Sequence, residues 1–195
     1  MSLKRTASHF CLIGSTTLLS LTASQAAFSR DGDMHPSHGR DGVTFGFGLG
    51  VGNLGCSGDG CDDFTEAGSF NAFIGGMAAH NLAVTFDAWW MVHSDDDFSV
   101  NQALLTGNVR FWPIEHFWLR GGLGVARAEY IYDGRFIDVS DRSEWVPAFV
   151  VGIGVEPIAT ESFGLDIKLE YGTGFYSEGD TRIHSTALSV GLSFY

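Results

Sequence analysis

The residues best suited to covalent chemistry stand in two adjacent pairs, His93 with Ser94 and His184 with Ser185. A serine nucleophile needs a histidine within hydrogen-bond reach and an acid that orients the ring. Neighbouring residues in a β-strand face opposite sides, so neither pair can act together if it lies in a strand. We therefore expect no catalytic residues and no enzyme activity.

A second pair of reactive side chains is Cys56 and Cys61, at the two ends of the segment CSGDGC. In an oxidising compartment two cysteines this close are expected to form a disulfide. The alternative is a metal site that uses both thiolates with Asp62 or Asp63.

Acidic clusters are weak candidates for a divalent cation, because carboxylate oxygens are the ligands that calcium prefers. A run of aspartates in a loop is more often simply solvated, and His35 and His38 are read in the same way. We expect no cofactor. The weak candidates are Asp59, Asp62, Asp63, Asp95, Asp96 and Asp97.

The first 26 residues have the features of a secretory signal rather than of a folded element. Lys4 and Arg5 precede a short apolar stretch, and small residues stand before an expected cut after Ala26. That stretch is shorter than the roughly 20 residues of a membrane-spanning helix, and no later segment qualifies. We expect a signal peptide at 1–26, a flexible N-terminal segment at 27–42 and one folded domain at 43–195.

The exported part is strongly acidic. Removal of the signal leaves 9 basic against 23 acidic side chains, a net charge of −14, which makes nucleic acid a poor partner. Glycine is abundant (26 residues), and charged residues make up only 17% of the chain. So few charges indicate that the exterior is not an ordinary soluble surface.

From Val43 onward the chain alternates large apolar residues with small or polar ones, which is the period of a β-strand. The same alternation predicts seven further strands, at 68–78, 82–92, 101–112, 117–130, 145–157, 162–173 and 184–195. Connections after even-numbered strands are short and those after odd-numbered strands are mostly long and acidic. The pattern predicts an all-β fold, an eight-stranded antiparallel up-and-down transmembrane β-barrel.

Volume decides which face of the barrel points inward. Eight strands enclose a space that side chains just fill, and the aromatic-rich face would overfill it. We therefore expect the apolar face to meet lipid, and the glycine-rich face to line the lumen with a network of ion pairs. The lumen network is predicted to contain Asp87, Arg110, Arg120, Glu156, Asp166, Lys168 and Glu170.

Aromatic residues at the strand ends are expected to form two girdles at the membrane interfaces. Trp112, Phe117 and Trp118 are placed at the short-turn rim. Trp89, Trp90, Tyr130, Tyr132, Trp145 and Tyr176 are placed at the loop rim. Trp89 and Trp118 have the parity of the lumen, so a position in the core is the alternative for these two.

The repeated GxGxGxG strands, the segment RFWPIEHFWLRGGLGVA (Arg110 to Ala126) and the aromatic end of the last strand resemble small outer-membrane barrels of the OmpA transmembrane-domain and opacity-protein type. The resemblance implies insertion by the outer-membrane assembly machinery. In such proteins the final aromatic usually has lipid-facing parity. Here Phe194 has that parity and Tyr195 does not, so we expect Phe194 to carry the signal.

These observations predict a non-enzymatic, monomeric barrel in the bacterial outer membrane, with a structural or surface-interaction role. Its partners are expected to be outer-membrane lipids and lipopolysaccharide, with the lumen plugged, the loops outside the cell and the termini in the periplasm. Two alternatives remain: a barrel enzyme that modifies lipid A, and a soluble periplasmic barrel that binds an apolar ligand as lipocalins do.

Overall fold

Nine antiparallel strands make up the part of the chain that the computed structural model describes, which is residues 40–58, 65–95, 98–134, 137–160, 162–176 and 182–195. None of the described residues forms a helix long and apolar enough to cross a membrane. The strands are β1 (Val43–Ser57), β2 (Thr65–Ala79), β3 (Leu82–Asp95), β4 (Phe98–Ile114), β5 (Phe117–Gly134), β6 (Ile137–Arg142), β7 (Val146–Ala159), β8 (Phe163–Phe175) and β9 (Arg182–Phe194).

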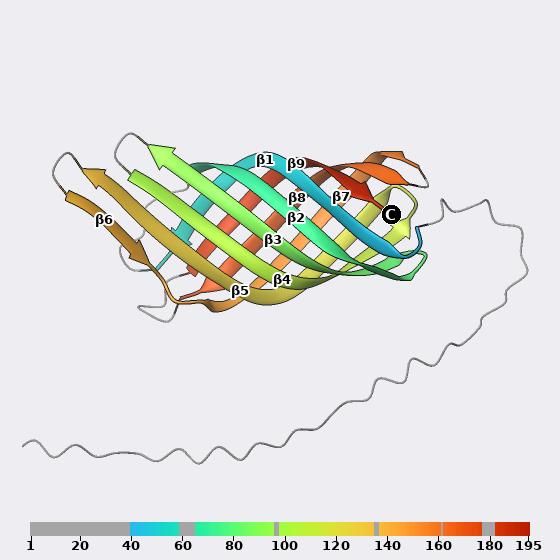
Figure 1. Ribbon diagram of the computed structural model, residues 1–195, viewed down its shortest axis with the longest axis horizontal. Helices are drawn as coiled ribbons and strands as arrows, with labels where there is room; N and C mark the ends of the chain where they lie inside the picture. Colours follow the sequence, from blue (N-terminus) through green and yellow to red (C-terminus); the bar gives the residue numbers. More distant parts are fainter. Residues whose placement is uncertain (1–39, 59–64, 96–97, 135–136, 161, 177–181) are drawn as a thin grey trace, which may run out of the picture. The chain divides into compact units, whose positions relative to one another are not determined.

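Eight of these strands close into a ring. Each pairs with its neighbours along the chain, β5 pairs with β7, and β1 pairs with β9 to complete the circle (Figure 1). At the closing seam Phe45 lies opposite Phe194, and their rings stack with centroids 5.0 Å apart. The expected eight-stranded antiparallel up-and-down barrel is confirmed.

The strand β6 was not expected from the sequence. It pairs only with the far end of β5, from Gly134 opposite Ile137 to Glu129 opposite Arg142. The pairing of β5 with β7 stops at Ala126, so the β5–β6 hairpin extends beyond it at the loop rim (Figure 1). Its sequence, IDVSDR, is short and mostly polar, and it offers too little apolar alternation to be recognised as a strand.

The large apolar side chains point away from the barrel axis, as the volume argument predicts. Leu123 is 75% exposed and Val51 is 70% exposed, although both stand in the middle of regular strands. The inward positions that alternate with these apolar residues hold mostly glycine, other small residues and charged residues, with a few large apolar side chains among them. The distribution of side chains is therefore the reverse of that in a soluble domain, because apolar side chains cover the exterior.

The interior contains two apolar clusters as well as charges. The larger cluster lies toward the loop rim and is built around Trp89, Met91 and Leu104. The smaller one lies near the short turns and consists of Ala83, Trp112 and Trp118. The interior is thus filled by side chains at both ends.

Glycines make room for the buried indoles. A Cβ atom at Gly154 would lie 2.4 Å from the ring of Trp118, which is fully buried and cannot move aside. We expect Gly154→Ala to lower the free energy of unfolding by about 1–3 kcal/mol through overpacking. Gly121→Ala is the matched control, because nothing lies within 4 Å of a Cβ at Gly121. Urea unfolding in detergent micelles compares the two, and equal stability of both variants would contradict the expectation.

Candidate functional site

Arg120 is the centre of the charged interior. Its guanidinium forms an ion pair with Asp87 and a second one with Glu170, at 3.0 Å from Nη2 to Oε1. The three residues come from β5, β3 and β8, so the contacts cross the lumen. All three are buried, and each acid therefore depends on this arginine for much of its charge compensation.

Lys168 and Asn71 extend the same cluster. The Lys168 ammonium lies 3.9 Å from Glu170 Oε1 and donates to Asn71 Oδ1 at 2.9 Å. The Asn71 amide donates in turn to Glu170 Oε2 at 2.7 Å. Asn71 therefore links an acid and a base that both belong to the predicted network.

Arg110 is held mainly by aromatic faces. Its guanidinium carbon lies 4.4 Å from the ring centre of Phe73 and 4.3 Å from that of Trp118. Such cation–π contacts are strongest where the cation is desolvated, and Arg110 is only 1% exposed. The acid at this level is Asp166, which accepts hydrogen bonds from Trp118 Nε1 at 2.7 Å and from the Ser193 hydroxyl. The Trp118 indole therefore contacts both charged groups: its ring packs against Arg110, and its N–H donates to Asp166.

Glu156 closes the interior at the short-turn end. It forms an ion pair with Arg40 and accepts hydrogen bonds from Trp112 Nε1 at 2.9 Å and from the Tyr195 hydroxyl at 2.8 Å. Tyr195 follows the last strand. Its burial, together with the nearby Glu156 carboxylate, raises the pKa of the phenol, so the phenol stays protonated and able to donate.

Arg40 is the part of this arrangement that sequence reasoning missed. It precedes the first strand and so has no parity from which its direction can be read. Its guanidinium also donates to the backbone oxygen of Glu115 at 2.8 Å and lies over the rings of Trp112 and Tyr195. With Arg40, the charged side chains buried among the described residues number four bases and four acids.

Among the seven residues proposed for the lumen network, all are buried and each is at most 5% exposed. Ion pairs join Asp87, Arg120, Lys168 and Glu170, and a separate one joins Glu156 to Arg40. Arg110 and Asp166 meet through Trp118 and Ser193 instead. The indole donors Trp112 and Trp118 were not anticipated as members of the network, although a core position was left open for Trp118.

The outer face changes from apolar to polar at one level near the loop rim. On β1 the outward positions are apolar up to Val51 and then polar at Asn53. On five other strands the first polar outward residues are Glu66 (β2), Ser94 (β3), Asn101 (β4), Arg127 (β5) and Thr186 (β9). The apolar stretches below this level, such as 43–51, 82–92 and 103–111, match the about 9 to 11 residues with which a tilted strand crosses a bilayer.

The aromatic residues divide between this face and the interior. Trp90, Tyr130 and Trp145 are exposed near the loop rim, as expected for a girdle. Trp89 and Trp118 lie inside, which settles the alternative left open for them. The placement of Trp112 in the turn-side girdle is wrong. It is 3% exposed because it shares the parity of Arg110 and points into the barrel.

In each His-Ser pair the two side chains point to opposite faces of the strand, as neighbouring residues in a strand do. Ser185 points inward and donates to Gln102, whereas the ring of His184 faces outward at 6.5 Å from that of Tyr171. His93 Nδ1 lies 2.6 Å from the backbone oxygen of Glu66, and the Ser94 hydroxyl lies 2.8 Å from that of Ser99. Neither geometry forms a nucleophile with its base.

The remaining candidates fall partly outside the described residues. Cys61 lies there, so the disulfide with Cys56 stays a prediction. The aspartates Asp59, Asp62, Asp63, Asp96 and Asp97 also lie there, and the side chain of Asp95 is not described. Within the described ranges, no three His, Cys, Asp or Glu side chains gather so as to hold a metal ion.

No protein-family model and no curated protein matches this chain. Solved structures do match. Ail, the attachment invasion locus protein of Yersinia pestis, has a TM-score of 0.61 at 16% identity, over 79% of this chain and 99% of Ail. Ail in complex with the heparin analogue sucrose octasulfate has a TM-score of 0.62 at 16% identity, over 78% and 99%. Neisserial surface protein A has a TM-score of 0.54 at 16% identity, over 79% and 99%.

These likenesses confirm the resemblance in fold to small outer-membrane barrels. At 16% identity, no partner-binding residue can be transferred from these proteins to this chain.

Proposed function

We propose that this protein crosses the bacterial outer membrane once as a closed barrel, without enzyme activity, and presents its loops for contacts at the cell surface. The observation that carries the proposal is the inverted distribution of side chains. Exposed Phe, Leu, Val and Ile cover the outside, while eight charged side chains among the described residues are buried within. In water the outer face would be costly, and in a bilayer it stabilises insertion by roughly 25 cal/mol per Å² buried.

The proposed orientation places the short turns, the start of β1 and the end of β9 in the periplasm. β2 ends at Ala79 and β3 begins at Leu82, and a similarly short turn joins β4 to β5. The start of β1 lies at the same rim, because the Met77 amide donates to Gly42 O. Short periplasmic turns and longer outer loops are the usual arrangement of such barrels. The signal peptide and the Cys56–Cys61 disulfide are further parts of the proposal.

Cell fractionation tests the membrane claim. We expect the protein to sediment with outer membranes, to resist extraction by alkaline carbonate and to dissolve in detergent. Release with the periplasm without detergent would instead support the soluble, lipocalin-like alternative. That alternative needs the aromatic face to line a cavity, whereas Phe45, Phe47 and Phe86 are each about half exposed.

We further propose that the lumen is plugged. Arg120 spans it between two strands, and Met91, Leu104 and Gln102 are fully buried nearer the loops. An eight-stranded barrel has room for such side chains and little else. Purified protein in a planar bilayer should therefore give no stepwise conductance under conditions in which a larger porin does. Reproducible ion-selective steps would contradict a plug and favour a path along the charged cluster.

The surface role is proposed from charge. The chain after the proposed signal peptide has a net charge of −14, and the charges buried among the described residues balance, so they contribute nothing to that excess. Ail has been solved with a polysulfated heparin analogue, but an acidic surface repels such a ligand. Basic protein surfaces, or lipopolysaccharide phosphates bridged by divalent cations, fit this charge better.

The lipid A enzyme remains a second candidate without a catalytic geometry to favour it. Mass spectrometry of lipid A from cells that overproduce the protein tests it directly. Unchanged lipid A is expected, and a new or missing acyl chain would overturn the non-enzymatic assignment.

A further inference from the structure

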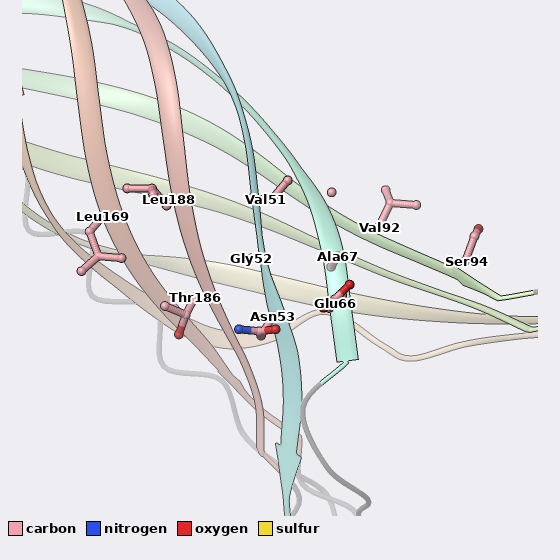
Figure 2. A pocket seen from close by; sticks show the side chains of 11 residues that line it. Val51, Gly52, Asn53, Glu66, Ala67, Val92, Ser94, Leu169, Thr186 and Leu188 are labelled. Atoms are coloured by element: carbon pink, nitrogen blue, oxygen red, sulfur yellow. The ribbon is translucent and has the colours of Figure 1, made fainter.

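A hollow of about 780 Å³ lies on the outer face of the barrel near the loop rim. Its lining comes from five strands, β1, β2, β3, β8 and β9. The side chains divide by chemistry along the strands (Figure 2). Val51, Leu188, Leu169 and Val92 belong to the apolar band, and Asn53, Thr186, Glu66 and Ser94 form its polar rim toward the loops.

The volume is within the about 300–1,000 Å³ of small-ligand sites. The hollow exists because Gly68 occupies an outward position of β2 and has no side chain to fill it. The next outward residue of β2 toward the short turns, Phe70, has a large side chain. A Cβ at Gly68 would meet only Val92 O, at 3.8 Å, so open space lies in front of this glycine.

The charge of the rim narrows the choice of ligand. Glu66 is exposed and, among the described residues that line the hollow, it is the only charged one. No ion pair between described residues involves its carboxylate. The backbone oxygen of Glu66 contacts His93 Nδ1, so this hydrogen bond does not involve the carboxylate. Asn53, Ser94 and Thr186 add neutral polar groups beside it.

We propose that this hollow binds a membrane lipid whose headgroup bears a primary ammonium. One acyl chain lies along Val51, Leu188 and Leu169, and the ammonium pairs with Glu66. The inference rests on the proposed membrane-spanning function, since the hollow continues the apolar band and its polar rim lies at the level where the headgroups begin. A headgroup with only anionic and hydroxyl groups gains nothing from Glu66 and is repelled by it.

Native mass spectrometry of the full chain in detergent micelles tests the proposal. Phosphatidylethanolamine and phosphatidylglycerol with identical acyl chains are added in competition. We expect ethanolamine lipid to be favoured about two- to fivefold, the effect of one exposed ion pair. Glu66→Gln should remove the preference. Glu144→Gln, which removes an exposed acid outside the hollow, should leave it unchanged.

A second variant tests the hollow itself. Gly68→Leu fills the space, since the nearest atom to a Cβ there is Val92 O at an ordinary contact distance of 3.8 Å, and it should lower the binding of both lipids several-fold. Gly107→Leu is its control, because Gly107 is also an outward glycine with nothing within 4 Å of a Cβ, and it lines a different hollow. β-sheet circular dichroism and melting temperature show that both variants fold.

Three outcomes would overturn the inference: no preference in the wild-type protein, an equal effect of Glu144→Gln, or a protein dimer that disappears with Gly68→Leu. The last would make the hollow an interface between two copies. Release of the protein without detergent would remove the proposed function too, whereas a membrane-extracted protein without lipid preference would remove the hollow alone.

Discussion

Replacing Arg120 with methionine should lower the free energy of unfolding by about 3–5 kcal/mol, because it leaves Asp87 and Glu170 buried without their main cation. Methionine has a similar length and keeps the lumen filled, so the loss reports charge rather than a cavity. The Lys168 ammonium, 3.9 Å from Glu170, compensates only part of it. Equilibrium urea unfolding in phospholipid vesicles, followed by tryptophan fluorescence, measures the change.

Arg142→Met is the matched control for this prediction. Arg142 forms an ion pair with Glu129 at the β5–β6 hairpin, but its side chain is 60% exposed. Exposed pairs contribute about 0–1 kcal/mol, since water screens them and their side chains lose entropy on pairing. A loss from Arg120→Met no larger than that from Arg142→Met would mean that the interior holds enough water to solvate the two acids.

Val151→Arg should destabilise the inserted barrel by about 2–4 kcal/mol. Val151 lies on the outer face in the middle of β7, opposite Gly121 and Tyr171, where the proposed bilayer is most apolar. A charged side chain there must reach across the hydrocarbon to find water. The measurement is reversible unfolding from phospholipid vesicles.

Asn53→Arg provides the comparison at the other depth. Asn53 faces outward at the polar level near the loop rim, where the cost of an arginine falls to about 0–1 kcal/mol. The difference in destabilisation between Val151→Arg and Asn53→Arg thus reports how deep the two positions lie in the bilayer. Equal effects, or a harmless Val151→Arg in a protein that stays soluble without detergent, would contradict a membrane-spanning barrel.

The architecture could be predicted from the sequence because strand alternation is local. Phe45, Phe47 and Leu49 alternate with glycines, and this alone fixes which residues share a face. The same parity placed Asp87, Arg120 and Glu170 in the interior. Their pairing across the lumen follows from the closure of the ring, which brings β3, β5 and β8 around one narrow space.

The features that could not be predicted depend on contacts that the two-residue alternation of a strand does not reveal. Arg40 lies before the first strand, and its ion pair with Glu156 joins residues far apart in the chain. Trp112 was misplaced because an aromatic residue at a strand end was read as an interface residue despite its parity. The hairpin strand β6 was missed because its stability comes from backbone pairing with an overlong β5 rather than from an apolar face.

The pairing of β1 with β9 has a consequence for how the chain must fold. β1 begins the barrel and one of its two partners is β9, so the ring cannot close until β9 is in place. Until then the sheet carries two open edges, which are templates for aggregation. For the barrel exported as proposed, these open edges must be shielded until insertion, and a chain that stops before residue 182 lacks the strand that closes the ring.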